Sequence, residues 1–189
     1  MFGTEATIAK GSISYIYGMT SLKQIEIPAT VSSVGDYAFN GCTGLREIEL
    51  SEELTTICAY AFQNCSSLER IDLPGSVTSL SARAFYNCTR LSEVGYPVSW
   101  TTTPSYYDRT VFGDGDGEYR SPFEGCGALK KIEIPEGVTA IPKHAFRSMT
   151  ALEEVILPES LTSIGAYAFD GCTKLKYITL PKNLTAIPN

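Results

Sequence analysis

The chain has 189 residues, 43% of them apolar and 19% charged, so it is long and hydrophobic enough to bury a core as one domain, residues 1–189. Its formal net charge of −6 argues against a nucleic-acid backbone or an anionic membrane surface as the main partner, because both need clustered Lys and Arg side chains. No apolar run approaches the roughly 18 residues of a membrane-spanning helix, so we expect no direct membrane insertion.

One sequence block recurs along the chain in the pattern L-x-x-[IV]-x-[IL]-P, then [VL]-[TS]-x-[IVL], then A-F-x-x-C. The leading Leu of successive blocks stands at Leu22, Leu45, Leu68, Leu91, Leu129, Leu152 and Leu175. These positions are evenly spaced except between Leu91 and Leu129, where the interval is longer. Such a period indicates a solenoid, in which each coil buries its apolar face against its neighbours.

Each block predicts three short elements in chain order. Residues 45–50 are apolar at the first, fourth and sixth positions, which is typical of a short strand with one buried face, and Pro ends the strand in most blocks. The apolar pair Leu54 and Ile57 predicts a second extended segment. The pair Ala61 and Phe62 follows, where we expect a single helical or 3₁₀ turn.

Seven such strands and a degenerate first coil over residues 1–21 predict about eight coils in a curved rod. Residues 98–121 form an insertion within the fourth full repeat, and residues 175–189 form an incomplete last repeat. Because that last repeat has no polar cap, we expect further repeats or a cap in the full gene.

The cysteines form a column rather than a disulfide framework. A Cys stands just before the leading Leu of five blocks, always at the same offset, at Cys42, Cys65, Cys88, Cys126 and Cys172. Met19 and Met149 take the same position in two other blocks. Methionine can replace cysteine at a buried apolar position, but it cannot replace a cysteine that forms a disulfide. We expect free, buried thiols in this column, with Cys58 at a bend as the most exposed thiol.

The combination of these motifs resembles the BspA-like branch of the leucine-rich repeat superfamily, over nearly the whole chain. The resemblance implies an α/β solenoid, a right-handed leucine-rich repeat superhelix with short parallel strands on its concave face. It also implies a secreted or cell-surface protein of bacteria or some protists, acting as an adhesion or protein-binding module. The family motif contains no catalytic residues, so none is carried over.

Two polar columns are expected to face outward from the concave strands. The third positions are Gln24, Glu47, Arg70, Glu93, Lys131, Glu154 and Tyr177. The fifth positions are Glu26, Glu49, Asp72, Gly95, Glu133, Ile156 and Thr179. These columns are either an ordinary solvated face or a binding strip for a basic or hydroxyl-rich partner. In the second case Glu26, Glu49, Arg70, Asp72 and Glu133 are candidate ligand contacts, and salt should weaken binding.

The insertion carries the single Trp of the chain and several other aromatic residues. It leaves the chain after the strand in which Gly95 interrupts the acidic column, so we expect it beside the concave face. Its candidate contacts for a protein or sugar are Trp100, Tyr106, Tyr107, Phe112 and Tyr119. The alternative is that these aromatics pack the loop onto its own repeat.

The acidic residues of the insertion are a weak candidate for calcium binding. Asp114, Asp116 and Glu118 alternate as oxygen donors, but an EF-hand has further ligands that are missing here. We therefore predict no metal site.

Few residues support an enzyme. The single histidine, His144, occupies a column held elsewhere by Tyr or Arg, so it is interpreted as a surface or half-buried residue. A remote alternative is a carboxylate-dependent glycoside hydrolase, since two concave acids at the right separation would suffice.

The sequence therefore predicts a noncatalytic, adhesion-type module that binds a protein or carbohydrate ligand through the concave face and the aromatic insertion, without a cofactor. The main alternative is a structural spacer that displays another domain. The first residues lack the pattern of a signal peptide, so either the protein is cytoplasmic or this chain is a trimmed piece of a longer exported one. Following the family resemblance, we expect the second, a secreted or cell-surface protein with its export signal and anchor outside this chain.

Overall fold

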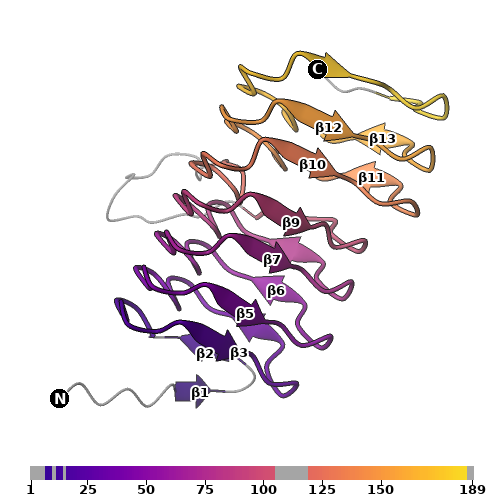
Figure 1. Cartoon of the computed structure of the whole chain (residues 1–189). Coiled ribbons are helices and arrows are strands. Elements are labelled where there is room, and N and C mark those ends of the chain that lie inside the picture. Colours follow the sequence, from indigo (N-terminus) through magenta and orange to yellow (C-terminus); the bar gives the residue numbers. More distant parts are fainter. Residues whose placement is uncertain (1–6, 10–11, 15, 105–118, 187–189) are drawn as a thin grey trace, which may run out of the picture.

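The computed structural model describes residues 7–9, 12–14, 16–104 and 119–186, which form a parallel-strand β-solenoid of about six turns (Figure 1). One column of strands faces the viewer in Figure 1 and is called the front face. Its strands are β3 (Gln24–Glu26), β5 (Glu47–Glu49), β7 (Arg70–Asp72), β9 (Glu93–Gly95), β10 (Lys131–Glu133), β12 (Glu154–Ile156) and β14 (Tyr177–Ile178).

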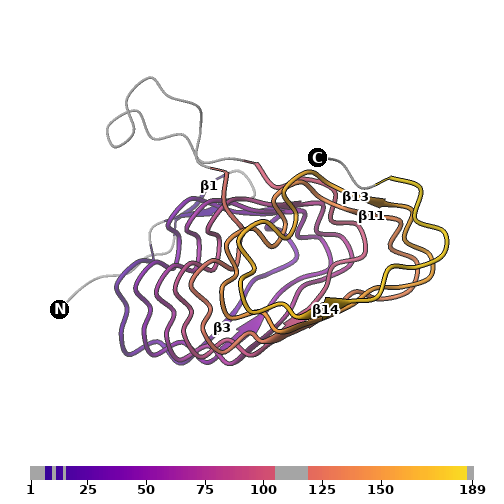
Figure 2. The same cartoon turned by 90° about the horizontal axis from the view of Figure 1, so that it is seen from above.

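A second column of shorter strands forms the back face, which Figure 2 shows on the opposite side of the coils. Its strands are β2 (Ser12–Ser14), β4 (Ser33–Val34), β6 (Thr56–Ile57), β8 (Ser79–Leu80), β11 (Ala140–Ile141) and β13 (Ser163–Ile164). Most successive strands of a column pair in parallel at an offset of one repeat, as Ile25 does with Ile48, but β5 does not pair with β7, β9 with β10 or β8 with β11. The period therefore predicted the strand columns correctly.

Two expectations about the coils are corrected: the solenoid has about six turns rather than eight coils, and no helix occurs among the described residues, so the fold is not α/β. The Ala-Phe segments are turns, and together they form the turn edge, on the left of Figure 1. Each turn contains residues in the left-handed backbone region, such as Tyr60 at φ 57° and Asn64 at φ 59°. A right-handed helix cannot include such residues, which explains why no helical turn forms.

The N-terminal part differs from a coil of the repeat. β1 (Thr7–Ala9) and β2 form an antiparallel pair, and β2 then pairs in parallel with β4, so the hairpin lies against the first edge of the back face. Ile16 is buried and its N–H donates to the carbonyl of Ala38, the arrangement that Phe39 repeats with Ala61. The hairpin thus covers an edge strand that would otherwise be open to pairing.

The core is a stack of identical positions from successive turns. Phe39, Phe62, Phe85 and Phe123 stack with ring centroids 5.1, 5.2 and 5.4 Å apart. Each turn therefore buries its apolar side chains against the next, and stability is shared between neighbours.

The cysteine column lies beside this stack, and all six thiols are free, as expected. Each column thiol donates to a carbonyl of the preceding turn, for example from Cys65 Sγ to Phe39 O at 3.3 Å. Burial raises the pKa of Cys42 and of Cys172 to about 11, so these two thiols are held protonated. Cys58 is half-buried rather than exposed.

The insertion starts later than the sequence indicated. Residues 98–104 continue the regular coil, because Thr102 pairs with Ser79 and the carbonyl of Pro104 accepts from Ala82 N at 2.9 Å. The chain returns to the repeat at Ser121 and Phe123, both buried. Within the described residues, no helix has the length and apolar character required to cross a membrane.

Candidate functional site

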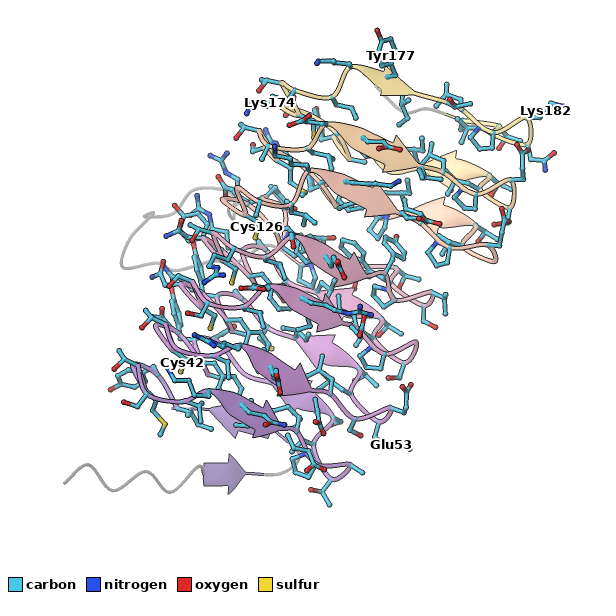
Figure 3. All side chains as sticks on the ribbon, in the orientation of Figure 1. Cys42, Glu53, Cys126, Lys174, Tyr177 and Lys182 are labelled. Atoms are coloured by element: carbon cyan, nitrogen blue, oxygen red, sulfur yellow. The ribbon has the colours of Figure 1, made fainter. Side chains whose placement is uncertain are left out.

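The front face presents two columns of exposed polar side chains, as the sequence predicted. The strand register brings equivalent residues of neighbouring turns side by side, such as Glu26 with Glu49 and Asp72 with Gly95. The central residue of each strand points inward and is buried or half-buried, as in β7, where Ile71 is buried between exposed neighbours. Figure 3 shows side chains of both charges projecting from this face.

Arg70 organises the charges in the middle of the front face. Its Nε and Nη2 donate to the two carboxylate oxygens of Asp72, each at 3.0 Å, and its Nη1 donates to Glu93 at 3.3 Å. These hydrogen bonds, with the charges of Asp72 and Glu93, raise the pKa of Arg70. The bidentate geometry fixes the direction of the Asp72 carboxylate.

Further pairs hold other residues of the columns. Gln24 donates to Glu49 at 3.2 Å, and Lys131 forms an ion pair with Glu154 at 3.3 Å. Glu133 makes neither a side-chain hydrogen bond nor an ion pair with the described part of the chain. Its carboxylate is therefore available to a ligand.

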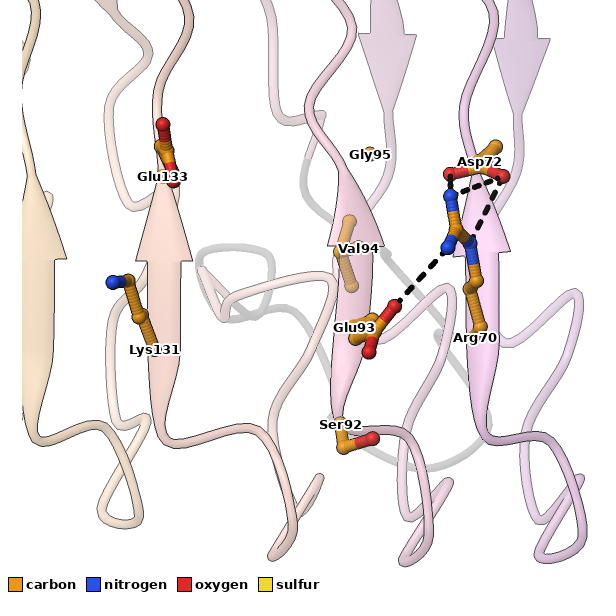
Figure 4. Close-up of a pocket in the computed structure, with 8 residues that line it drawn as sticks. All are labelled: Arg70, Asp72, Ser92, Glu93, Val94, Gly95, Lys131 and Glu133. Atoms are coloured by element: carbon orange, nitrogen blue, oxygen red, sulfur yellow. Dashed lines mark hydrogen bonds and ion pairs between the residues drawn. The ribbon is translucent and has the colours of Figure 1, made fainter.

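A shallow depression of about 280 Å³ lies at the centre of the front face, between β9 and β10 (Figure 4). Arg70, Asp72, Glu93, Gly95, Lys131 and Glu133 line it. A Cβ at Gly95 would lie 2.9 Å from Asp72 Oδ1 and 3.2 Å from Asp72 Cα, so glycine lets Asp72 lie against β9 and a larger residue would displace it. The depression thus brings together three of the predicted contacts, Arg70, Asp72 and Glu133.

Glu26 and Glu49, the other two predicted contacts on this face, lie outside this depression on β3 and β5. Glu49 lines a second depression, of about 400 Å³, with Glu52 and Asp72. A third, of about 390 Å³, is lined by Glu154, Ile156 and Tyr177. The front face therefore offers a row of shallow depressions rather than one deep pocket.

Trp100, predicted as a ligand contact, is instead part of the core. It is 2% exposed, and its Nε1–H donates to the carbonyl of Thr102 at 2.8 Å. Its ring stands nearly perpendicular to those of Phe123 and Phe146, with centroids 6.3 and 5.9 Å away. A side chain so enclosed cannot contact a ligand, so the alternative of packing onto its own repeat is correct for Trp100.

Tyr119 is 44% exposed and joins the turn edge instead of the front face. Its ring stacks on His144 at 4.9 Å, and its carbonyl accepts from Arg147 Nη1 at 3.2 Å. This residue near the end of the insertion is therefore fixed away from the front strands. The remaining predicted residues of the insertion lie outside the described residues: Tyr106, Tyr107, Phe112, Asp114, Asp116 and Glu118.

His144 is 8% exposed and lies between the rings of Tyr119 and Tyr167. Burial, with the positive charges of Arg147 and Lys143, lowers its pKa, so the imidazole is neutral at pH 7. It is therefore a buried scaffold residue, more enclosed than the sequence suggested. The described residues include no group of three or more His, Cys, Asp or Glu side chains placed to hold a metal ion.

An ion pair strengthens the turn edge next to the insertion. Arg83 Nε donates to Glu124 Oε2 at 2.7 Å, and the two side chains are each only 17% exposed. Arg83 also donates to the hydroxyl of Tyr60 at 3.0 Å. Burial opposes its charge, but these hydrogen bonds raise the pKa of Arg83. The sequence reasoning missed this pair because Arg83 and Glu124 are separated by the insertion.

The parallel strand columns, the stacked core and the polar front face define a repeat scaffold of the leucine-rich type. In a comparison with known protein families, the sequence model of the family described as "BspA type Leucine rich repeat region" matches this chain in six copies, over residues 12–107 and 119–189. The chain belongs to this family, as its motifs indicated. Members are typically binding or adhesion-type modules and generally non-enzymatic scaffolds.

Solved bacterial structures share the fold. A leucine-rich repeat protein of T. pallidum is 31% identical, with a TM-score of 0.66 over 87% of this chain and 70% of its own. A leucine-rich repeat protein of Eubacterium ventriosum is 27% identical, with a TM-score of 0.69 over 93% of this chain and 43% of its own. One from Bacteroides ovatus is 26% identical, with a TM-score of 0.54 over 92% of this chain and 48% of its own.

The chain therefore spans less than half of the Eubacterium and Bacteroides proteins. No curated protein matches it.

Proposed function

We propose that the chain is a noncatalytic binding module whose front face holds an extended segment of a partner protein, with a basic side chain of that segment over Gly95. The observation that carries this proposal is the depression between β9 and β10, which is lined by the acids Asp72, Glu93 and Glu133. Arg70 already binds Asp72 and Glu93, so Glu133 is the carboxylate that a basic side chain would pair with. A Lys or Arg side chain has the charge and the slender shape that this position accepts.

The weakness of exposed ion pairs favours an extended ligand. An exposed pair contributes only about 0.2–1 kcal/mol, so one basic side chain over Gly95 gives little affinity. The neighbouring depressions beside Glu49 and Tyr177 lie along the same face and provide further contacts. A segment crossing several strands therefore adds many small contributions, and its binding weakens as ionic strength rises.

The test is selection of peptides on the intact chain from a random displayed library, followed by fluorescence anisotropy with the synthetic peptide. We expect basic peptides, and a loss of up to about fivefold in affinity for Gly95→Ala, equivalent to about 1 kcal/mol. Glu133→Gln removes the charge with little change of volume and should weaken binding and its salt dependence. Gly127→Ala is the matched control, since a Cβ there meets nothing within 4 Å.

Three results would contradict the proposal. Equal affinity of Gly95→Ala and wild type would place binding elsewhere. Selection of neutral peptides whose affinity does not change with ionic strength would contradict the proposed pairing of a basic side chain with the acids of the front face. If no peptide were selected and no glycan of an array bound the chain, the results would support the structural spacer function instead.

We also propose that the protein acts outside the cell. Its membership of the BspA-type family supports this location, and the proposed role in binding a partner is consistent with it. Brief protease treatment of intact source cells should release peptides of this protein. Protection equal to that of a cytoplasmic marker protein would refute the location.

A further inference from the structure

At one junction between successive turns, the described residues make none of the backbone hydrogen bonds that join other turns on the front face, the back face or the turn edge. In regular turns the bonds recur, as from Phe62 N to Ala84 O at 2.8 Å and from Thr162 N to Thr139 O at 2.9 Å. Across the junction between the turns that contain β9 and β10, called the seam, the described backbone atoms make no such bond. Both the front and the back strand columns stop pairing there, whereas between β5 and β7 only the front column stops pairing and the back column continues from β6 to β8.

The sequence explains part of this interruption. Pro142 occupies the bend position of Cys58, Ser81 and Gly165, whose N–H groups donate to the preceding turn at 2.8–2.9 Å. Proline has no N–H to donate, so this bond cannot form at the seam.

The turn edge also departs from the pattern. Phe123 N donates to the hydroxyl of Ser121 at 3.1 Å, and that hydroxyl donates to the carbonyl of Ala145 at 2.8 Å. A side chain therefore replaces the direct backbone bond at this position.

The aromatic core changes at the same junction. Trp100 stands between Phe123 and Phe146 as a wedge, in edge contact with both rings. Elsewhere the Phe rings stack directly on one another, as Phe146 does on Phe169 at 5.3 Å. The core therefore continues across the seam, but through a different packing arrangement.

The polar contacts that do cross the seam gather on the turn edge. Arg120 Nη1 donates to Ser148 Oγ at 3.2 Å, Arg147 donates to the carbonyl of Tyr119, and Ser121 donates to Ala145. The ring of Tyr119 stacks on His144 at 4.9 Å. On the front face, by contrast, no hydrogen bond or ion pair joins β9 to β10 within the described part of the chain.

We propose that the seam is a hinge whose pivot is the turn-edge contact set of residues 119–121 with residues 144–148. Two blocks of regular turns, each held by continuous backbone bonds along the back face and the turn edge, rotate about this pivot, so that β9 and β10 separate on the front face. Motion concentrates where the fewest contacts cross, because each repeat is stabilised only by its neighbours. The inference rests on the interrupted bonds and holds whether or not the front face binds a peptide.

Distance distributions from pulsed electron spin resonance test the hinge directly. Spin labels on a noncanonical amino acid leave the six native thiols untouched. The pair Glu47 and Glu154 spans the seam on the front strands, and the pair Thr43 and Thr150 spans the same length of chain at the turn edge. The pair Gln24 and Glu93 lies within the first block. All six sites are exposed.

The hinge predicts that the distance distribution of the Glu47 and Glu154 pair is at least about twice as broad as the distributions of the other two pairs. Only this pair crosses the seam on the front face, where β9 and β10 separate. Removing the pivot in Arg120→Ala should broaden the turn-edge distribution as well. Equal widths for the three pairs would overturn the proposal. If the turn-edge pair of the wild type had a distance distribution as broad as that of the front pair, the pivot would lie elsewhere, and this too would overturn the proposal.

Discussion

Replacing Trp100 by Ala separates a scaffold role from a ligand-binding role. The side chain is 2% exposed, contacts Phe123 and Phe146 edge-on, and donates a hydrogen bond of 2.8 Å to Thr102. A buried Trp removes about 150–250 Å² from water, or about 4–6 kcal/mol at 25 cal/mol per Å². Because Ala keeps part of this burial and neighbouring side chains relax, we expect a loss of about 3–5 kcal/mol of unfolding free energy.

The assay is urea unfolding followed by far-UV circular dichroism, since the substitution removes the single Trp that fluorescence would report. Tyr177→Ala is the control: this aromatic is 84% exposed, so its loss should change the free energy by less than about 0.5 kcal/mol. A Trp100→Ala protein as stable as wild type would refute the buried wedge. Loss of peptide binding without loss of stability would restore Trp100 as a ligand contact.

The turn edge and the thiols give three further predictions. Arg83→Ala should lower the unfolding free energy by about 1.5–3 kcal/mol, because it removes charged hydrogen bonds to the half-enclosed Glu124; an unchanged urea midpoint would contradict this. A thiol reagent at pH 8 should modify the half-buried Cys58 and Cys172 before the four buried thiols, and all six should be modified completely only after unfolding; rapid native reaction of all six would be inconsistent. The pKa of His144 is lowered from 6.5 by folding, so the unfolded chain takes up a proton first and wild-type stability falls as pH drops below about 6.5. His144→Tyr, the residue common in this column, should lose less stability over that range in urea titrations, and parallel pH profiles would contradict the buried neutral imidazole.

The period alone located the strands and the buried columns, because both depend on side-chain pattern at fixed spacing. It placed the turns at the Ala-Phe pairs but did not give their conformation, since left-handed residues such as Tyr60 and His144 carry no distinctive side-chain type. A helical turn was therefore the natural expectation from the Ala-Phe pair, and it was wrong.

The misplacement of Trp100 has a simple cause. Extending the period beyond Pro97 would have assigned Trp100 to the buried slot of Leu54 and Val77, which stand two repeats and one repeat before it. Its size and its place next to an irregular segment favoured a binding role over packing.

The depression at Gly95 was only partly predictable. The gap in the acidic column was visible in the sequence, and the columns correctly identified the outward residues of the front face. The interruption between β9 and β10 was not visible, because it depends on how the chain returns after the insertion. Only Pro142, which lacks the donor present in other turns, signalled it.

The central claim is that the front face around Gly95 holds an extended basic segment, and an NMR titration of the intact chain with a selected peptide tests it most directly. The account predicts that the largest amide shifts fall in β7, β9 and β10, including Gly95, and that they shrink in Glu133→Gln. Shifts confined to the back face or the turn edge, with β9 and β10 unaffected at saturation, would contradict it.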